Sequence, residues 1–364
     1  MRRLFAPLLA IAAIGAAIAA DNAPIGVFDS GVGGLTVLEQ MLAMDRYDNV
    51  TGERHPDGRP DFDRERFVYF GDQANMPYGD YSAAGKSEYL RKLIVADAEF
   101  LLAKKAKVIV IACNTATAWG LDRVTERASR DGVRTIGVIG AGVRSALALP
   151  AFAAATGPLS IGVIATPGTI ASGAYERTIR AEAARLGLKA RISVFSQGCP
   201  GLADAVEAGD PKANEIAQTN LRALLAQHAA ATNAGPVAAI ILGCTHYPFV
   251  LPALQEIAPE MPFVDPAIAT AEECFLSLRD ADRAGAGAQS LSAYISVPAR
   301  GLDPKCLDAE GNLTRAVKYG RELDDPTVWT EPKAYGRAES ERNAFIRRAL
   351  PATWRQISAG STDR

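Results

Sequence analysis

The chain has 364 residues, of which 48% are hydrophobic and 22% charged, a composition typical of a globular protein long enough for two domains. The formal net charge of −2 argues against the basic groove of a nucleic-acid-binding protein and against a polybasic membrane surface. Three histidines, and five cysteines without a Cys-x-x-Cys spacing, argue against a structural zinc site, so we expect no metal.

The first twenty residues differ from the rest of the chain. Arg2 and Arg3 precede an apolar, alanine-rich stretch that ends in small residues before Asp21. This order is typical of a secretory signal peptide, and the stretch is short for a membrane span, which needs about 20 residues. We therefore expect residues 1–20 to be a signal peptide and the mature protein to be periplasmic. The alternatives are a retained membrane anchor, or a cytoplasmic protein if the segment is not functional.

Residues 25–28 are the first of several short apolar runs that predict buried strands. The runs at 136–139 and 161–164 open with the same three residues, Ile-Gly-Val. Such runs, bounded by turn residues, are typical of strands buried on both faces of a parallel sheet. Helical patterns lie between them, at residues 35–44, 86–105, 119–131, 170–186 and 213–231. This alternation predicts an α/β fold with parallel sheets.

A glycine-rich loop, residues 29–34, follows the first predicted strand. It lacks both the glycine spacing of a dinucleotide-binding loop and the lysine of a P-loop. Its glycines would let the backbone approach a ligand closely. Asp29 is either a helix cap or a proton partner or ammonium binder, and the residues alone leave both interpretations open.

Residues 45–66 interrupt the alternation. They are charged and contain prolines. We expect this segment to be an exposed loop.

Two later runs, residues 108–115 and 239–246, are alike: each has an apolar stretch, a small residue, a cysteine and small polar residues. Cys113 and Cys244 therefore fall where strands end, which is where open α/β sheets bind ligands. The start of a following helix would also lower the pKa of each thiol. Two thiols in matching contexts predict two similar halves, with one thiol on each side of a single ligand. We expect the other cysteines to be buried hydrophobic residues, namely Cys199, Cys274 and Cys306.

Two further residues near these runs carry ionisable side chains. His246 comes two positions after Cys244, where an imidazole can stabilise a thiolate, although a lone histidine is more often structural. Composition alone indicates a solvated surface acid at Glu207.

The chain loses the strand–helix alternation after about residue 285. This part contains Trp329 and Trp354 and ends in an amphipathic helix predicted near 337–356. We expect it to pack on the surface or at a subunit contact, and we assign it no chemistry.

Six short stretches, in the same order along the chain, resemble the glutamate racemases of the cofactor-independent aspartate/glutamate racemase superfamily. They are residues 28–34, 69–72, 77–79, 113–116, 198–200 with Glu207, and 243–248. The resemblance implies two similar parallel-sheet α/β domains with the active site in the cleft between them, here with a C-terminal extension. We expect the first domain at 24–117 plus about 266–285, the second at 118–265 and the extension at 286–364.

The same resemblance implies roles for individual residues. Cys113 and Cys244 would be the catalytic thiols, with Asp29 assisting Cys113, and with Glu207 and His246 assisting Cys244. The substrate-binding residues would be Asp29, Ser30, Pro77, Tyr78, Gly79, Asn114, Thr115, Thr245 and His246. The implied reaction interconverts L- and D-glutamate for peptidoglycan without a cofactor, and a homodimer is left open.

The chemistry of racemisation agrees with a pair of thiols on opposite sides of the substrate. Inversion at Cα needs a base on one face and an acid on the other, and a thiolate and a thiol can exchange these roles.

The chain also departs from the family pattern. The family usually has a Lys-Ser pair directly after the tyrosine and glycine, whereas here residues 80–82 intervene and Lys86 and Ser87 come later. Three alternatives therefore stay open: a racemase of aspartate or another amino acid, an exported non-catalytic amino-acid-binding protein, and a thiol–disulfide protein.

Overall fold

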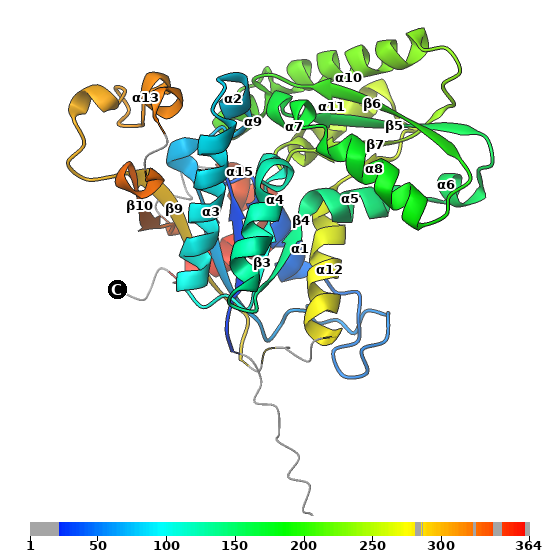
Figure 1. Ribbon diagram of the computed structural model, residues 1–364. Coiled ribbons are helices and arrows are strands. Elements are labelled where there is room, and N and C mark those ends of the chain that lie inside the picture. Colours follow the sequence, from blue (N-terminus) through cyan, green and yellow to red (C-terminus); the bar gives the residue numbers. More distant parts are fainter. Residues whose placement is uncertain (1–21, 281–284, 286, 323–324, 338–343, 361–364) are drawn as a thin grey trace, which may run out of the picture.

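The computed structural model describes residues 22–280, 285, 287–322, 325–337 and 344–360 (Figure 1). Strands and helices alternate along most of these residues, and the strands form two separate sheets. The expected α/β class is therefore confirmed. The expected signal peptide, residues 1–20, lies outside the described part. Among the described residues, no helix is both long and apolar enough to cross a membrane.

The first sheet has six strands in the order β10-β9-β2-β1-β3-β4. Neighbouring strands run parallel, except that β10 pairs antiparallel with β9 at one edge. The strands are β1 (Ile25–Asp29), β2 (Arg66–Gly71), β3 (Val108–Ile111), β4 (Arg134–Gly137), β9 (Ser290–Pro298) and β10 (Thr330–Ala334).

The second sheet has four parallel strands in the order β6-β5-β7-β8. They are β5 (Pro158–Ala165), β6 (Arg191–Gly198), β7 (Val237–Gly243) and β8 (Phe263–Val264). The same order appears in the first sheet as β2-β1-β3-β4, so the two halves are similar, as the paired cysteine runs predict. In both sheets the winding reverses between the first and third strands, and ligands of open α/β sheets bind beside that point.

Helices cover both faces of each sheet (Figure 1). The first sheet is covered by α1 (Leu35–Ala43), α3 (Ser87–Ala103), α4 (Asn114–Ser129), α12 (Pro266–Asp280) and α16 (Pro351–Gly360). The second is covered by α5 (Val138–Leu147), α8 (Ala174–Arg185), α9 (Leu202–Ala208), α10 (Ala213–Ala230) and α11 (Leu251–Ile257). The shorter helices are α2 (Gly79–Ala83), α6 (Pro150–Ala154), α7 (Pro167–Ala171), α13 (Arg315–Gly320) and α15 (Ala344–Ala349). Four 3-10 turns are η1 (Gln73–Asn75), η2 (Tyr247–Val250), η3 (Pro304–Cys306) and η4 (Pro326–Val328).

Alternate residues of the central strands point to opposite faces of the first sheet. Val27 and Val110 pack in the cluster that includes α1, α12 and α16, whereas Phe28 and Ile111 pack in the cluster that includes α3 and α4. All four side chains are fully buried. Because both faces are covered, the strands need continuous apolar runs rather than alternating ones.

The first sheet extends further along the chain than expected. β4 pairs with β3, so this sheet includes residues up to Gly137 and does not end at residue 117. The apolar run at 136–139 is a strand only as far as Gly137, because α5 begins at Val138. Periodicity cannot separate a buried strand from a buried helix in so short a run.

Residues 45–66, expected to be an exposed loop, are partly buried. Tyr47 and Phe62 are buried, and the Phe62 ring packs edge-on against Phe275 of α12 at 5.4 Å. Asp61 is also buried, and its carboxylate accepts hydrogen bonds from the backbone N–H groups of Arg46 and Tyr47. The charged composition concealed these anchoring residues.

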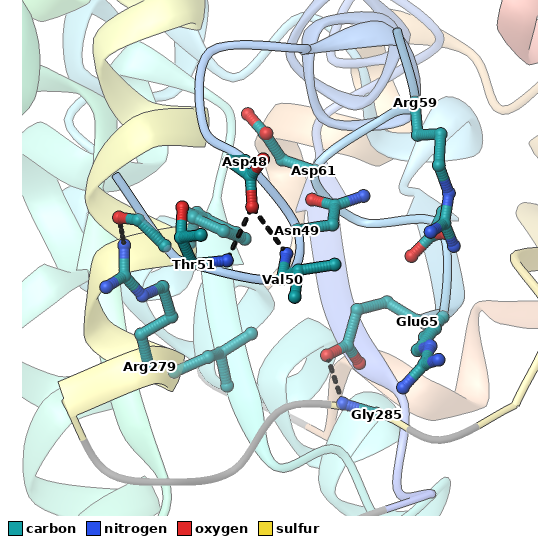
Figure 2. Close-up of a pocket in the computed structure, with 14 residues that line it drawn as sticks. Asp48, Asn49, Val50, Thr51, Arg59, Asp61, Glu65, Arg279 and Gly285 are labelled. Atoms are coloured by element: carbon teal, nitrogen blue, oxygen red, sulfur yellow. Dashed lines mark hydrogen bonds and ion pairs between the residues drawn. The ribbon is translucent and has the colours of Figure 1, made fainter. Parts of the chain in front are cut away.

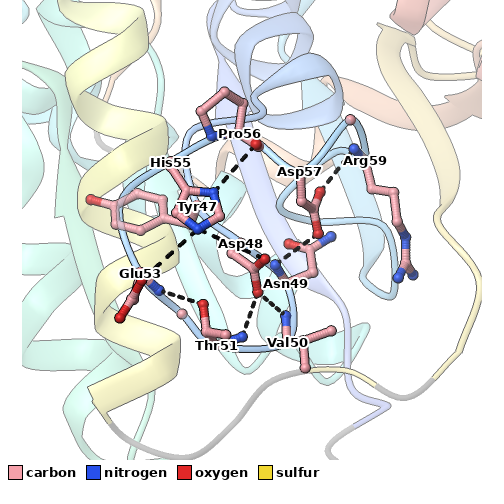
Figure 3. Close-up of polar contacts among 12 residues, drawn as sticks. Tyr47, Asp48, Asn49, Val50, Thr51, Glu53, His55, Pro56, Asp57 and Arg59 are labelled. Carbon is pink, nitrogen blue, oxygen red and sulfur yellow. Dashed lines mark hydrogen bonds and ion pairs between the residues drawn. The ribbon is translucent and has the colours of Figure 1, made fainter.

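Polar contacts within this loop hold its turn (Figure 3). Asp48 Oδ1 accepts hydrogen bonds from the backbone N–H groups of Val50 and Thr51. The same turn lines a cavity beside α12, where Arg279 Nη1 donates to the Gly52 carbonyl at 2.7 Å (Figure 2). The loop therefore packs as part of the first domain.

The segment after residue 285 is not merely a surface tail. β9 pairs with β2 over its length from Ser290 to Ile295, and β10 then forms the edge of the sheet. Leu291, Tyr335 and Ile357 are buried in the core of the first domain. The helix expected near 337–356 is described in part, as α15 and α16, while residues 338–343 lie outside the description.

Candidate active site

Cys113 and Cys244 follow strands that adjoin the reversal points of the two sheets. Cys113 comes two residues after β3 and caps α4, since its Sγ accepts a hydrogen bond from Ala116 N–H at 3.4 Å. Cys244 comes directly after β7, but the turn η2 begins only at Tyr247. A helix start therefore contacts the first thiol, as expected, whereas the surroundings of the second are set mainly by side chains.

Both sulfur-bearing residues line one cavity, although they come from different sheets. Its empty space, including the open mouth, is about 330 Å³. Cys113 and Cys244 are 6% and 7% exposed, so the cavity is their contact with the outside. The lining residues are Ser30, Met76, Pro77, Tyr78, Gly79, Cys113, Asn114, Thr115, Thr166, Ala203, Gly243, Cys244 and His246.

The surroundings of Cys113 favour the protonated thiol. Its Sγ lies 3.6 Å from Ser30 Oγ, and the hydrogen bonds with Ser30 and with the Ala116 N–H lower the pKa of the thiol, but burial outweighs them. Burial raises the pKa of Cys113 well above its ordinary value, and the negative charge of Asp29 adds to this effect. Burial also raises the pKa of Asp29, from 3.8 to about 6, although the charge of His246 opposes the shift. Cys113 is thus suited to donate a proton, with a buried carboxylate beside it.

The surroundings of Cys244 supply a cation instead. Cys244 Sγ lies 3.7 Å from His246 Nδ1, and His246 Nε2 lies 2.5 Å from Glu207 Oε2. Burial alone would lower the pKa of His246, but its contacts with Cys244 and Glu207 raise it well above the ordinary value. Gln73 Nε2 donates to the other oxygen of Glu207 at 2.8 Å. A charged imidazole beside Sγ can stabilise a thiolate.

Asp29 is held between the two halves of the site. Its Oδ2 accepts from the Gly31 N–H at 2.9 Å, and its Oδ1 accepts from Thr245 Oγ1 at 3.5 Å. Gly34, not Asp29, is the N-cap of α1. The helix-cap interpretation of Asp29 is therefore wrong, and its complete burial agrees with a role in proton transfer.

Glycines in the loop 29–34 make room for the side chains of the site. A Cβ atom at Gly33 would lie 2.4 Å from His246 Cε1, and one at Gly34 would lie 2.4 Å from Asp29 Cβ. These glycines therefore permit a close approach of neighbouring side chains, while the close approach of the backbone to a ligand stays a prediction.

Hydroxyl and amide groups form the polar wall at the start of α4. The Thr115 hydroxyl lies 3.0 Å from that of Thr166 and 2.9 Å from that of Thr169. Asn114 Oδ1 accepts from the Tyr175 hydroxyl at 2.6 Å, which leaves Nδ2 as the amide donor that Asn114 can offer a ligand. These contacts join the first domain to the second at the cavity.

Tyr78 lines the cavity, but its hydroxyl points to two buried carboxyl groups. It lies 2.6 Å from Asp72 Oδ2 and 2.7 Å from Asp97 Oδ2. Burial and the charge of Asp72 raise the pKa of Asp97 well above its usual range. A phenol has one proton to donate, so Tyr78 donates to only one of the two carboxyl groups at a time, and the raised pKa favours a protonated Asp97 as the donor to Tyr78. The hydroxyl thus holds the segment around Tyr78 in place at the cavity.

The structure brings the expected site residues together in two layers. Nine line the cavity, namely Ser30, Pro77, Tyr78, Gly79, Cys113, Asn114, Thr115, Cys244 and His246. Three others lie behind them and contact one another or His246, namely Asp29, Glu207 and Thr245.

Sequence reasoning missed several contributors to this site, among them Thr166, Gln73 and Tyr175. Thr166 follows β5 and lines the cavity, so the rule that identified the cysteines at strand ends would also have found it. Gln73 and Tyr175 carry no comparable signal, because only folding brings them to Glu207 and Asn114.

The remaining cysteines take no part in the cavity. All five cysteines lie in the described part of the chain and are free thiols. Cys199 and Cys274 are buried, as expected, whereas Cys306 is partly exposed. The described residues contain no group of three or more His, Cys, Asp or Glu side chains that could hold a metal ion.

Two α/β domains each bring one cysteine to a shared cavity, an arrangement that suits an enzyme with one acid–base group on each side of its substrate. A sequence model of Asp/Glu/Hydantoin racemases matches residues 67–274. The chain belongs to the Asp/Glu/Hydantoin racemase family, and by this family it is an isomerase.

Individual relatives agree with this assignment. The glutamate racemase of Syntrophus aciditrophicus is 38% identical over 253 residues, which cover 68% of this chain and 77% of that protein. Among solved structures, the glutamate racemase of Francisella tularensis in complex with D-glutamate is 28% identical, with a TM-score of 0.57 over 75% of this chain and 88% of that one. The glutamate racemase of Thermus thermophilus in complex with beta-chloro-D-alanine is 29% identical, with a TM-score of 0.55 over 84% and 96% of the two chains.

Proposed function

We propose that this protein is a glutamate racemase that interconverts L- and D-glutamate by proton transfer at Cα without a cofactor. The observation that carries the proposal is the placement of Cys113 and Cys244, one from each domain, on a single cavity. The glutamate racemases among its relatives and structural neighbours support the choice of substrate.

The surroundings of the two thiols suggest how the reaction begins. Cys244, next to the His246 imidazole, is suited to remove the Cα proton as a thiolate, while the Cys113 thiol delivers a proton to the opposite face. The reverse reaction exchanges the two roles. Asp29 and Glu207 then serve as the carboxylates that take up or return protons behind each thiol.

The negative charge that develops on the substrate needs hydrogen-bond donors. Ser30, Asn114 and Thr115 line the cavity beside Cys113 and can bind the α-carboxylate. Preorganised donors of this kind stabilise a transition state more than water does, because they need no reorientation.

Exchange of the Cα proton for solvent deuterium tests the proposal. We expect wild-type protein to racemise glutamate and to exchange this proton, and we expect Cys113→Ser and Cys244→Ser to lower the racemisation rate by roughly 10²-fold or more. Cys306→Ser is the matched control, since Cys306 lies outside the cavity.

Three outcomes would contradict the proposal that the protein is a two-thiol glutamate racemase. Racemisation by either cavity variant at the wild-type rate would exclude the two-thiol scheme. Binding of glutamate without deuterium exchange would indicate a binding protein. A preference for aspartate or another amino acid in a panel assay would reject glutamate as the substrate.

We further propose that the D-glutamate formed supplies peptidoglycan synthesis and that the protein is exported to the periplasm. The basic and apolar N-terminal residues support export, and the family resemblance supports the biosynthetic role. Cell fractionation with an antibody to the mature chain, together with N-terminal sequencing, tests export and cleavage near residue 20. Recovery of the full-length chain in the cytoplasm would contradict it.

A further inference from the structure

We propose that Lys318 and Arg321, from the C-terminal extension, are positioning residues that hold the cavity wall formed by residues 72–79. This inference rests on the proposed function, because the wall includes Pro77, Tyr78 and Gly79. Figure 1 shows α13, which carries Lys318, beside α2.

Lys318 contacts the wall directly. Its Nζ donates a hydrogen bond to the Met76 carbonyl at 2.7 Å. Met76 and the next residue, Pro77, both line the cavity with the two cysteines. The ammonium group therefore fixes the backbone at the edge of the site.

Arg321 is buried and contacts the same segment through its side chain. Its side chain is 5% exposed, and its Nη2 donates to Asn75 Oδ1 at 2.6 Å and to the Tyr81 hydroxyl at 3.1 Å. The guanidinium also lies 4.8 Å from the Tyr89 ring and 5.6 Å from the Trp329 ring. A planar cation between aromatic rings has little freedom to move, so it is a stable anchor.

A chain of hydrogen bonds leads from Arg321 to the cavity. Asn75 Nδ2 donates to both carboxylate oxygens of Asp72, at 2.9 and 3.0 Å. Asp72 in turn accepts from the hydroxyl of Tyr78, which lines the cavity. Three successive contacts thus connect Arg321 of the extension with Tyr78 at the cavity.

The extension also contacts the wall through β9. Ser296 Oγ donates to Asp72 Oδ1 at 2.6 Å and accepts from the Ala74 N–H at 2.9 Å. The wall therefore receives support from two separate parts of the extension.

The wall depends on these side chains because its own backbone forms little regular structure. It contains the short turn η1 and begins with Asp72 in a non-helical conformation. Segments without a hydrogen-bonded ladder keep their shape through contacts from neighbouring elements. Loss of the Lys318 contact should let the wall shift, and a small misplacement of a binding group weakens substrate binding.

Steady-state kinetics with glutamate in both directions test this inference. We expect Lys318→Met to raise KM roughly tenfold with kcat within about twofold of wild type, since the wall binds substrate and transition state alike. Lys318→Arg keeps the charge and the donors and should restore most of the wild-type KM. Lys305→Met is the matched control, because Lys305 is an exposed residue of the same extension.

A second variant, Ser296→Ala, removes support from β9 and should also raise KM. An unchanged KM in both Lys318→Met and Ser296→Ala would overturn the inference, as would an equal change in Lys305→Met. A lower melting temperature with an unchanged KM would also overturn it, because the contact would then be structural only. If wild-type protein racemises no amino acid, the proposed function itself fails, which separates the two cases.

Discussion

Cys113 and Cys244 occupy matching places in the two domains but have different neighbours. The first lies beside Asp29 and a helix start, and the second lies beside His246, which contacts Glu207. Each carboxylate is mostly or fully buried, which holds it close to the group it contacts. The duplication therefore provides two thiols, while their different surroundings agree with the proposed roles of one as the acid and the other as the base.

The pH dependence of stability should report the buried carboxylate of Asp29. Its pKa of about 6 lies above the ordinary value of 3.8, so the folded protein binds this proton more tightly than the unfolded chain does. This stabilisation is present at low pH and is lost as the pH rises through about 6. The difference between these two pKa values corresponds to about 3 kcal/mol in the free energy of unfolding.

Asp29→Asn should remove that dependence. At pH 8 we expect the variant to be more stable to urea than wild type, by up to about 3 kcal/mol, and the gain to disappear near pH 4. Activity should fall. The exposed Asp122→Asn variant is the control, and the same pH profile for all three proteins would contradict the interpretation.

At the scale of elements, the loop after β1 must pass close to the turn after Cys244. Thr36 Oγ1 contacts the carbonyls of both Gly33 and Thr245, at 3.0 and 3.4 Å, which brings the start of α1 against this turn. Gly33, whose added Cβ would lie within 3 Å of His246 and Thr245, is therefore required by packing between the domains.

Gly33→Ala should reduce activity strongly. The added Cβ would lie 2.4 Å from His246 Cε1, so the imidazole must move away from Cys244. We expect kcat/KM to fall by roughly 10²-fold, since misplaced catalytic groups lose about this much. Gly157→Ala is the control, because no atom lies within 4 Å of its added Cβ. Equal kinetics for the two variants would show that the clash is relieved without moving His246.

At the scale of the whole molecule, the chain beyond residue 285 completes the first domain. It adds β9 and β10 to the sheet, packs α16 on α1, and contacts the substrate wall. We therefore expect the extension to unfold together with the first domain as one unit.

Ile357→Ala tests this expectation. Ile357 of α16 is 4% exposed and lies in the core cluster of the first domain, so truncation should lower the free energy of unfolding by about 2–4 kcal/mol. Val328→Ala, at a residue that is 57% exposed, should change it by less than about 0.5 kcal/mol. Calorimetry that showed α16 melting separately, with the main transition unchanged, would contradict the expectation.

The sequence by itself determined the class of fold and the position of the two thiols. Buried parallel strands require continuous apolar runs, and the residue that ends such a run is visible without coordinates, as for Cys113 and Cys244. The residues themselves left two interpretations open for Asp29 and for His246, and the resemblance to racemases then implied catalytic roles for both and added residues 77–79.

Only the tertiary structure decided which distant residues meet. Glu207 contacts His246 across 39 positions, and Ser296 contacts Asp72 across 224. Composition indicated a surface acid at Glu207, which only the resemblance associated with His246 and Cys244, and a surface tail at Ser296. Local patterns encode local conformation, whereas contacts of this kind depend on how complete elements pack against one another.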